Sequence, residues 1–123
     1  MNLEHIKLVI TDMDGTLLNS KHEVSERFLK QFEILKSHNI LFTAASGRPY
    51  YSIIDKLKSI KNDILVVAEN GGIIADNVQL LASRSMDSSK LKTIDFSINT
   101  IKDIITIYCS KDLAYIKQTT QNN

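Results

Sequence analysis

The sequence predicts an α/β protein built on a largely parallel sheet, and two observations support this class. Continuous apolar runs rich in β-branched residues occur at 6–11, 40–45 and 64–68, which is typical of buried strands. Segments in which apolar residues recur at helical spacing separate these runs. A strand, a helix and a second strand in this order form a right-handed βαβ unit with parallel strands.

The first predicted strand, 6–11, has the pattern of a strand buried on both faces and leads directly into Asp12 and Asp14. Side chains two residues apart in an extended segment point the same way, so these two carboxylates can share a metal ion or a phosphoryl group. Gly15 lets the chain turn and exposes backbone N–H groups. An acidic turn is the plainer alternative, but the strand places both carboxylates at the sheet edge where open α/β folds bind ligands.

The first helix is expected to begin after Ser25, a good N-cap, and to end near His38 and Asn39, because Asn tolerates the left-handed C-terminal position. Its apolar face comprises Phe28, Leu29, Phe32 and Leu35. The second strand, 40–45, follows and is expected to be parallel to the first.

The segment Ser46-Gly47-Arg48-Pro49 follows the second strand, and Pro49 is well placed to open a second helix. The apolar face of that helix comprises Tyr50, Ile53, Ile54 and Leu57. Ser46 either caps this helix or, as we favour, contacts a phosphate beside the Asp12 loop. Arg48 is either a surface cation or a substrate contact, and the sequence does not decide between them.

The third strand, 64–68, is followed by Glu69-Asn70-Gly71-Gly72, where the glycines indicate a tight turn with left-handed dihedral angles. A β-hairpin is then predicted from 73–75 and 78–81 around Asp76 and Asn77. From about Ser83 the sequence becomes more polar.

In this last part the pattern predicts a helix and a second hairpin. The helix carries Leu91, Ile94 and Ile98 and breaks at Asn99 and Thr100. The hairpin strands are 104–109 and 113–117, on either side of 110–112.

The bulk composition excludes several functional classes. The chain has 123 residues, enough for one modest core, and a formal net charge of +1, which argues against nucleic-acid or membrane-surface binding. The single cysteine, Cys109, excludes an internal disulfide and fits the cytoplasm. The first five residues lack the features of a signal peptide, and no apolar run is long enough to span a bilayer.

Three segments, 12–20, 45–49 and 69–72, together resemble the motifs of the haloacid dehalogenase (HAD) superfamily, and more closely the Cof-type phosphatases. The resemblance implies an incomplete HAD-type Rossmann-like parallel sheet with a β-hairpin and the start of an α/β cap. On this basis residues 1–82 are expected to form the N-terminal part of the core and 83–123 a truncated cap domain.

The same resemblance assigns roles to the polar residues at the sheet edge. Asp12 would attack phosphorus to form an aspartyl-phosphate, and Asp14 would serve as general acid and base. Both would contribute to a Mg²⁺ site, Asp14 through its backbone carbonyl. The substrate would be a small phosphorylated metabolite.

Further residues would hold the phosphoryl group. The resemblance assigns this role to the Met13 N–H, to Ser46 and Gly47, and to Asn70. Arg48 is a weaker candidate for a contact with the substrate.

Two features of the family are missing. The chain contains no Gly-Asp pair that could begin the second acidic motif, and no lysine stands in the expected place after a complete cap. We therefore expect a truncated phosphatase that is weakly active or inactive alone, with its first strand exposed as an edge that favours self-association.

Two other classes remain as alternatives. The chain would be a non-catalytic phosphate- or metal-binding module, or a subunit that a partner chain completes. A receiver-type phosphoacceptor fits less well, because the end of the third strand holds Ala68, Glu69 and Asn70 rather than the aspartate that this class needs.

Overall fold

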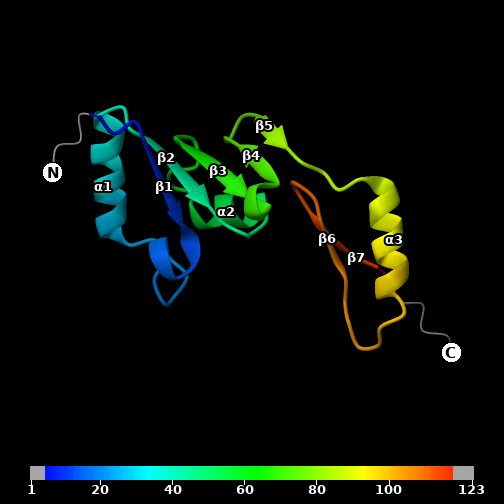
Figure 1. Ribbon diagram of the computed structural model, residues 1–123. Coiled ribbons are helices and arrows are strands. Elements are labelled where there is room, and N and C mark those ends of the chain that lie inside the picture. Colours follow the sequence, from blue (N-terminus) through cyan, green and yellow to red (C-terminus); the bar gives the residue numbers. More distant parts are fainter. Residues whose placement is uncertain (1–4, 118–123) are drawn as a thin grey trace. The chain divides into compact units, whose positions relative to one another are not determined.

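The computed structural model describes residues 5–117, which divide into two compact units between Arg84 and Ser85 (Figure 1). The first unit contains β1 (Leu8–Asp12), the irregular turn η1 (Met13–Leu17), α1 (Glu26–Ser37), β2 (Leu41–Ala45), α2 (Tyr50–Lys56), β3 (Ile64–Ala68), the short turn η2 (Glu69–Gly71), β4 (Ile73–Ala75) and β5 (Leu80–Ser83). The second contains α3 (Ser88–Ile98), β6 (Ile107–Cys109) and β7 (Ala114–Ile116). The outer ends of the two predicted domains lie outside the described residues.

The sheet of the first unit has the order β1-β2-β3-β4-β5. The first three strands are parallel, as the sequence predicts, and β4 and β5 add an antiparallel hairpin. In the register, Asp12 pairs with Ala45, and Ala45 pairs with Val67. The carboxyl ends of the three parallel strands therefore meet at one edge of the sheet.

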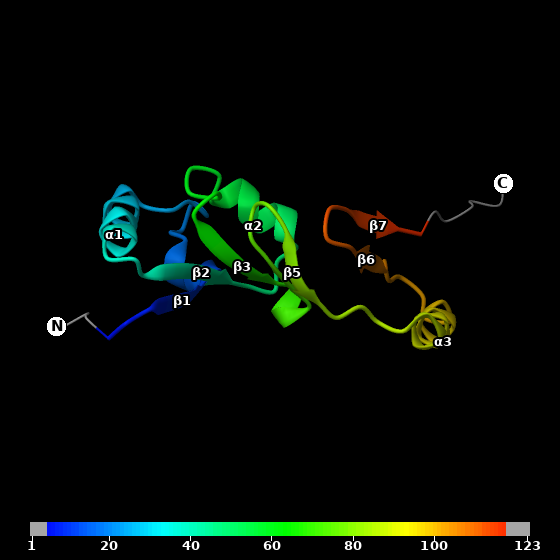
Figure 2. The same ribbon diagram turned by 90° about the horizontal axis from the view of Figure 1, so that it is seen from above.

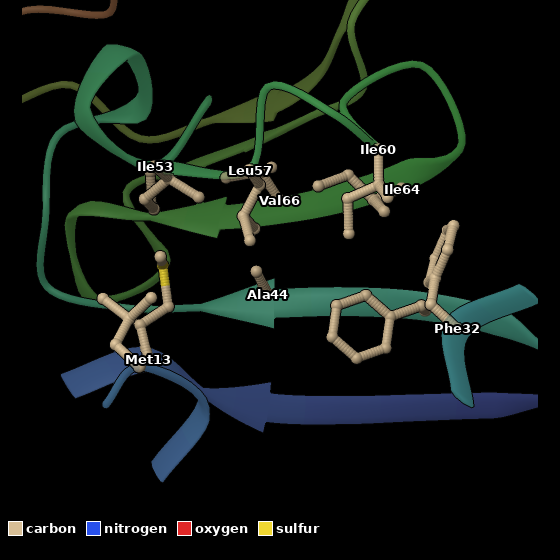
Figure 3. Close-up of a cluster of buried hydrophobic side chains, with 11 residues drawn as sticks. Met13, Phe32, Ala44, Ile53, Leu57, Ile60, Ile64 and Val66 are labelled. Atoms are coloured by element: carbon tan, nitrogen blue, oxygen red, sulfur yellow. The ribbon is translucent and has the colours of Figure 1, made fainter. Parts of the chain in front are cut away.

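Both helices of the first unit lie on the same side of its sheet (Figure 2). Two successive right-handed crossovers that progress in one direction across a sheet produce this arrangement. The shared core lies between helices and sheet, where Phe32 of α1 and Ile53 of α2 pack in one cluster with Ala44 and Val66 (Figure 3). All four of these side chains are at least 98% buried, so this cluster is the main source of hydrophobic stabilisation.

The opposite face of β1 is exposed, so the prediction that this strand is buried on both faces is wrong. Leu8 is 46% exposed, Ile10 is 59% exposed, and the neighbouring Leu41 of β2 is 42% exposed. Helices α1 and α2 cover the other face of the sheet, so no element of the first unit covers these side chains. Within the described residues β1 is also an edge of the sheet, as expected.

The ends of α1 follow the predicted signals. The Ser25 hydroxyl accepts a hydrogen bond from the Phe28 N–H at 3.1 Å, the geometry of an N-cap. Beyond the helix, Asn39 adopts a left-handed conformation with φ of 55°. Both predictions are confirmed.

The β4–β5 hairpin is confirmed, but its turn is shifted by one residue. The Asp76 N–H donates to the Gln79 carbonyl at 3.1 Å, so the two central residues are Asn77 and Val78. The Asp76 carboxylate also accepts from the Val78 N–H at 2.7 Å. This side-chain acceptor stabilises the turn one position beyond the predicted one.

In the second unit, the Asp87 carboxylate caps α3 by accepting the Ser89 N–H at 2.9 Å. Asp95 of α3 accepts hydrogen bonds from the Tyr108 hydroxyl and, at 3.1 Å, from Lys117 Nζ. These contacts connect the helix with the β6–β7 hairpin, whose strands are shorter than predicted. No helix in residues 5–117 is both long and apolar enough to cross a membrane.

Candidate active site

Three strand ends bring the predicted site residues to one edge. Asp12 is the last residue of β1 and pairs with Ala45, the last residue of β2. Ser46 directly follows Ala45 and therefore lies at the same edge of the sheet as Asp12. The Ser46 N–H donates to the Val67 carbonyl at 2.9 Å, which ties the end of β2 to β3. Asn70 lies in the turn that directly follows β3.

At the start of the turn η1, the apolar Met13 is buried while the acidic residues on either side of it are exposed. The Met13 side chain is fully buried and packs in the core (Figure 3). Gly15 has a φ of 76°, a left-handed conformation that glycine adopts without strain. The Leu18 N–H then closes the turn by donating to the Met13 carbonyl at 2.9 Å. The buried methionine anchors the turn, while Asp12 and Asp14 stay exposed on either side of it.

The Asp12 carboxylate accepts a side-chain hydrogen bond from the turn that follows it. The Thr16 hydroxyl donates to Asp12 Oδ2 at 3.4 Å, a long hydrogen bond. Because Asp12 is exposed, its carboxylate is accessible at the sheet edge, as a nucleophile or metal ligand requires.

Asp14 forms an ion pair with Arg48. The sequence had left the role of Arg48 open between a surface cation and a substrate contact. Arg48 Nε donates to Asp14 Oδ2 and Arg48 Nη2 donates to Asp14 Oδ1, both at 2.7 Å. This is the two-point geometry in which Arg binds carboxylates most strongly. The hydrogen bonds from Arg48 hold the pKa of the Asp14 carboxyl below its ordinary value, so the pair favours ionised Asp14.

His22 lies beside this ion pair, a placement that sequence reasoning missed. Its Nδ1 is 3.7 Å from Asp14 Oδ1, and its side chain is 63% exposed. The Asn19 carboxamide oxygen accepts N–H groups from Lys21 and Glu23, which folds the loop back toward Asp14. This Asx turn was the signal available in the sequence.

Ser46 does not cap α2. Its hydroxyl accepts the Arg48 N–H at 3.1 Å, while α2 begins at Tyr50 after Pro49 and has no side-chain cap. The capping alternative is therefore wrong, and the hydroxyl stabilises the short segment that carries Arg48. Gly47 lies in the same segment, against the Asn70 side chain.

Asp12 and Asp14 offer oxygen donors of the kind that a magnesium ion would need. Two carboxylates at a sheet edge are hard oxygen ligands, and Mg²⁺ is often held by one or two carboxylates together with substrate phosphate. Arg48 binds the Asp14 carboxylate, so the Asp12 carboxylate and the Asp14 backbone carbonyl are the candidate donors that this ion pair leaves unoccupied. No group of three His, Cys, Asp or Glu side chains suited to a metal occurs in residues 5–117. The donor chemistry therefore fits Mg²⁺, but the ligand set is incomplete.

Comparison with known proteins identifies the family. The sequence model for haloacid dehalogenase-like hydrolases matches residues 9–123. The chain belongs to this family. Among haloacid dehalogenase-like relatives, the Escherichia coli 5-amino-6-(5-phospho-D-ribitylamino)uracil phosphatase YbjI is 34% identical over 111 residues, which cover 89% of this chain and 41% of YbjI. The Bacillus subtilis phosphatase of the same description, YwtE, is 33% identical over 90 residues, 72% of this chain and 31% of YwtE.

Solved structures agree with the HAD fold. SMU.1108c from Streptococcus mutans superposes with a TM-score of 0.82 at 27% identity, covering 95% of this chain and 45% of that one. A haloacid dehalogenase-like hydrolase from B. subtilis gives a TM-score of 0.74 at 24% identity, covering 84% and 36%, and supports the fold alone. The chain thus spans less than half the length of these relatives. The predicted family and the predicted HAD-type α/β fold are confirmed.

Proposed function

We propose that this chain carries the nucleophile part of a Cof-type, magnesium-dependent phosphatase that acts on small phosphate esters through an aspartyl-phosphate. The observation that supports this most is the register of β1 and β2, which brings Asp12 beside Ser46 at the carboxyl edge, with Asp14 two residues on. Membership in a hydrolase family that includes phosphatases supports the reaction class.

In the proposed reaction, an Asp12 carboxylate oxygen attacks phosphorus, and the bond from phosphorus to the ester oxygen breaks. Asp14 gives a proton to the departing alcohol and then takes one from the water that attacks the aspartyl-phosphate. That second attack releases phosphate and restores the Asp12 carboxylate. Mg²⁺, held by Asp12 and Asp14, would neutralise charge between carboxylate and phosphate.

The isolated 123-residue chain is expected to be weakly active or inactive. Asp14 must carry a proton to act as the acid, and the hydrogen bonds from Arg48 favour its ionised form. A phosphate ester would compete with Asp14 for the guanidinium, because both are anions that Arg binds through two points. The family's lysine and second acidic motif are also absent from the sequence.

We propose 5-amino-6-(5-phospho-D-ribitylamino)uracil as the first substrate to test. Both curated relatives described above bear the name of a phosphatase for this compound, and one of them matches 89% of this chain. A generic aryl phosphate serves as the comparison substrate.

The test combines binding with turnover. Beryllofluoride, which mimics a phosphoryl group on a carboxylate, is titrated with Mg²⁺ into the chain and into Asp12→Asn, followed by NMR. Binding by the wild type alone, together with slow phosphate release that Asp12→Asn abolishes, would support the proposal. Equal binding or equal phosphate release in Asp12→Asn would contradict it. Rapid, Asp12-dependent turnover by the monomer would contradict only the expected weak activity.

A second candidate is a non-catalytic phosphate- or metal-binding module, or a subunit that a partner chain completes. The Asp14–Arg48 ion pair favours it, because it occupies the proposed acid in the described chain. Calorimetric titration with Mg²⁺, with Asp14→Ala as the control, together with light scattering, separates the two candidates. Tight Mg²⁺ or phosphate binding without any phosphate release would favour the binding module.

A further inference from the structure

The turn that follows β3 has an unusual backbone. Glu69 and Asn70 both have a φ of 53°, and Gly71 has a φ of 93°, so three consecutive residues are left-handed. Glycine adopts this region freely and asparagine tolerates it, whereas glutamate is strained there. Such strain persists only where surrounding contacts impose it, and it clusters at functional sites.

The backbone of this turn holds the segment that carries Arg48. The Glu69 N–H donates to the Arg48 carbonyl at 3.1 Å, and the Asn70 N–H donates to the Ser46 carbonyl at 3.2 Å. The β2–β3 ladder ends at Ala45 and Val67. The two left-handed residues therefore extend the connection between the strands into the loop, beyond the last ladder pair.

The Asn70 side chain completes this contact by packing against Gly47. A Cβ atom added to Gly47 would lie 3.0 Å from Asn70 Oδ1 and 3.2 Å from Nδ2, closer than a side chain normally approaches. The left-handed glycines of the described chain are Gly15 and Gly71, so the backbone at 47 does not itself require glycine. A larger residue at position 47 would therefore have to displace the Asn70 carboxamide.

We propose that Asn70 is a positioning residue that holds the Ser46–Arg48 segment where the Arg48 guanidinium meets Asp14. The Ser46 hydroxyl binds the Arg48 N–H in this segment, and the Arg48 side chain binds Asp14 through two hydrogen bonds. This role differs from the direct phosphate contact that the family resemblance implies. It concerns the ligand-free chain and does not rest on the proposed reaction.

The test is a double-mutant cycle of Gly47→Ala and Asn70→Gly, read out by hydrogen exchange of the Arg48 Nε–H in ¹⁵N NMR. Asp14→Ala defines the exchange rate without the ion pair. Gly47→Ala is expected to speed exchange about fivefold in the wild-type chain and to have little effect when Asn70→Gly is also present. Asn70→Gly alone keeps the left-handed backbone but is expected to move exchange toward the Asp14→Ala rate.

Asn77→Gly is the matched control, because Asn77 also lies in a turn and its carboxamide donates one hydrogen bond, to Asn62 at 2.7 Å. It should leave Arg48 exchange unchanged. If Gly47→Ala unfolds the chain, the double variant should fold again. Equal effects of Gly47→Ala in both backgrounds, or a double variant that stays unfolded, would overturn the inference. Because no phosphate is present, failure of the proposed function leaves this measurement valid.

Discussion

The Arg48 guanidinium binds the Asp14 carboxylate through two hydrogen bonds of 2.7 Å, between residues 34 positions apart in the sequence. The pair joins the loop after β2 to the turn after β1, at the edge where Asp12 and Ser46 also lie. It sets the charge of the proposed general acid before any substrate arrives.

Replacing Arg48 with lysine is expected to raise the pKa of Asp14 toward its ordinary value. A lysine ammonium is a point charge that cannot reproduce the planar two-point contact. The measurement is the ¹³C chemical shift of the Asp14 carboxyl as a function of pH. Arg27→Lys, a substitution of the same type on α1, should leave this titration unchanged. An unaltered Asp14 titration in Arg48→Lys would show that the two-point contact lowers the pKa of Asp14 no more than a simple positive charge does.

The Arg48–Asp14 pair should also contribute to acid stability. Because the folded-state pKa of Asp14 lies below the ordinary 3.8, its stabilisation is present above that value and is lost as pH falls through the lowered one. Asp87 and Asp95 have lowered pKa values for similar reasons, through hydrogen bonds from Ser89 and from Tyr108. Denaturant unfolding measured from neutral pH to about pH 2 should show a shallower acid loss in Arg48→Met than in wild type. Parallel curves would contradict this contribution.

Ser46→Ala should weaken binding of the phosphoryl mimic beryllofluoride by roughly tenfold, the effect of removing one hydrogen bond to a charged group. The hydroxyl also accepts the Arg48 N–H, so the loop itself will loosen slightly. Ser46→Thr keeps the hydroxyl and should restore most of the affinity. Ser59→Ala, in the loop after α2, is the matched control. A Ser46→Ala chain that binds as tightly as wild type would remove Ser46 from the phosphate site.

The exposed edge of β1 is expected to cause self-association. Leu41 N–H donates to the Lys7 carbonyl, and in a parallel ladder alternate residues direct their backbone groups to the free side. Leu8 and Ile10 alternate with the residues of β1 whose backbone groups bind β2, so their own backbone groups point to the free edge, and their side chains are exposed as well. The β1–β2 register is continuous, without a bulge that would hinder the pairing of another strand with β1. We therefore propose that a second copy pairs with this edge.

Light scattering across a concentration series tests the self-association. Ile10→Lys should shift the chain to a monomer, because a charge on an edge strand opposes pairing. Val78→Lys, at a residue that is 89% exposed in the β4–β5 turn, should leave the association unchanged. A wild-type chain that stays monomeric throughout, or an Ile10→Lys chain that associates as before, would contradict this proposal.

Much of the fold was predictable because its signals are local. The N-cap at Ser25 and the left-handed Asn39 depend on the chemistry of single residues, and they bound α1 as predicted. The hairpin turn lies one residue beyond the predicted position because the Asp76 carboxylate accepts the N–H groups of Val78 and Gln79, which stabilises the turn centred on Asn77 and Val78. The exposed face of β1 could not be read from apolar spacing, because the pattern records what a strand can bury and not what covers it.

The sequence by itself determined the elements, the HAD resemblance and the convergence of Asp12, Ser46 and Asn70 on one sheet edge, because parallel strands align their carboxyl ends. Only the tertiary structure decided what these residues contact. The partner of Arg48 and the packing of Asn70 on Gly47 join loops distant in sequence. Such contacts depend on loop paths and rotamers set by packing of the whole unit, and no local pattern encodes them.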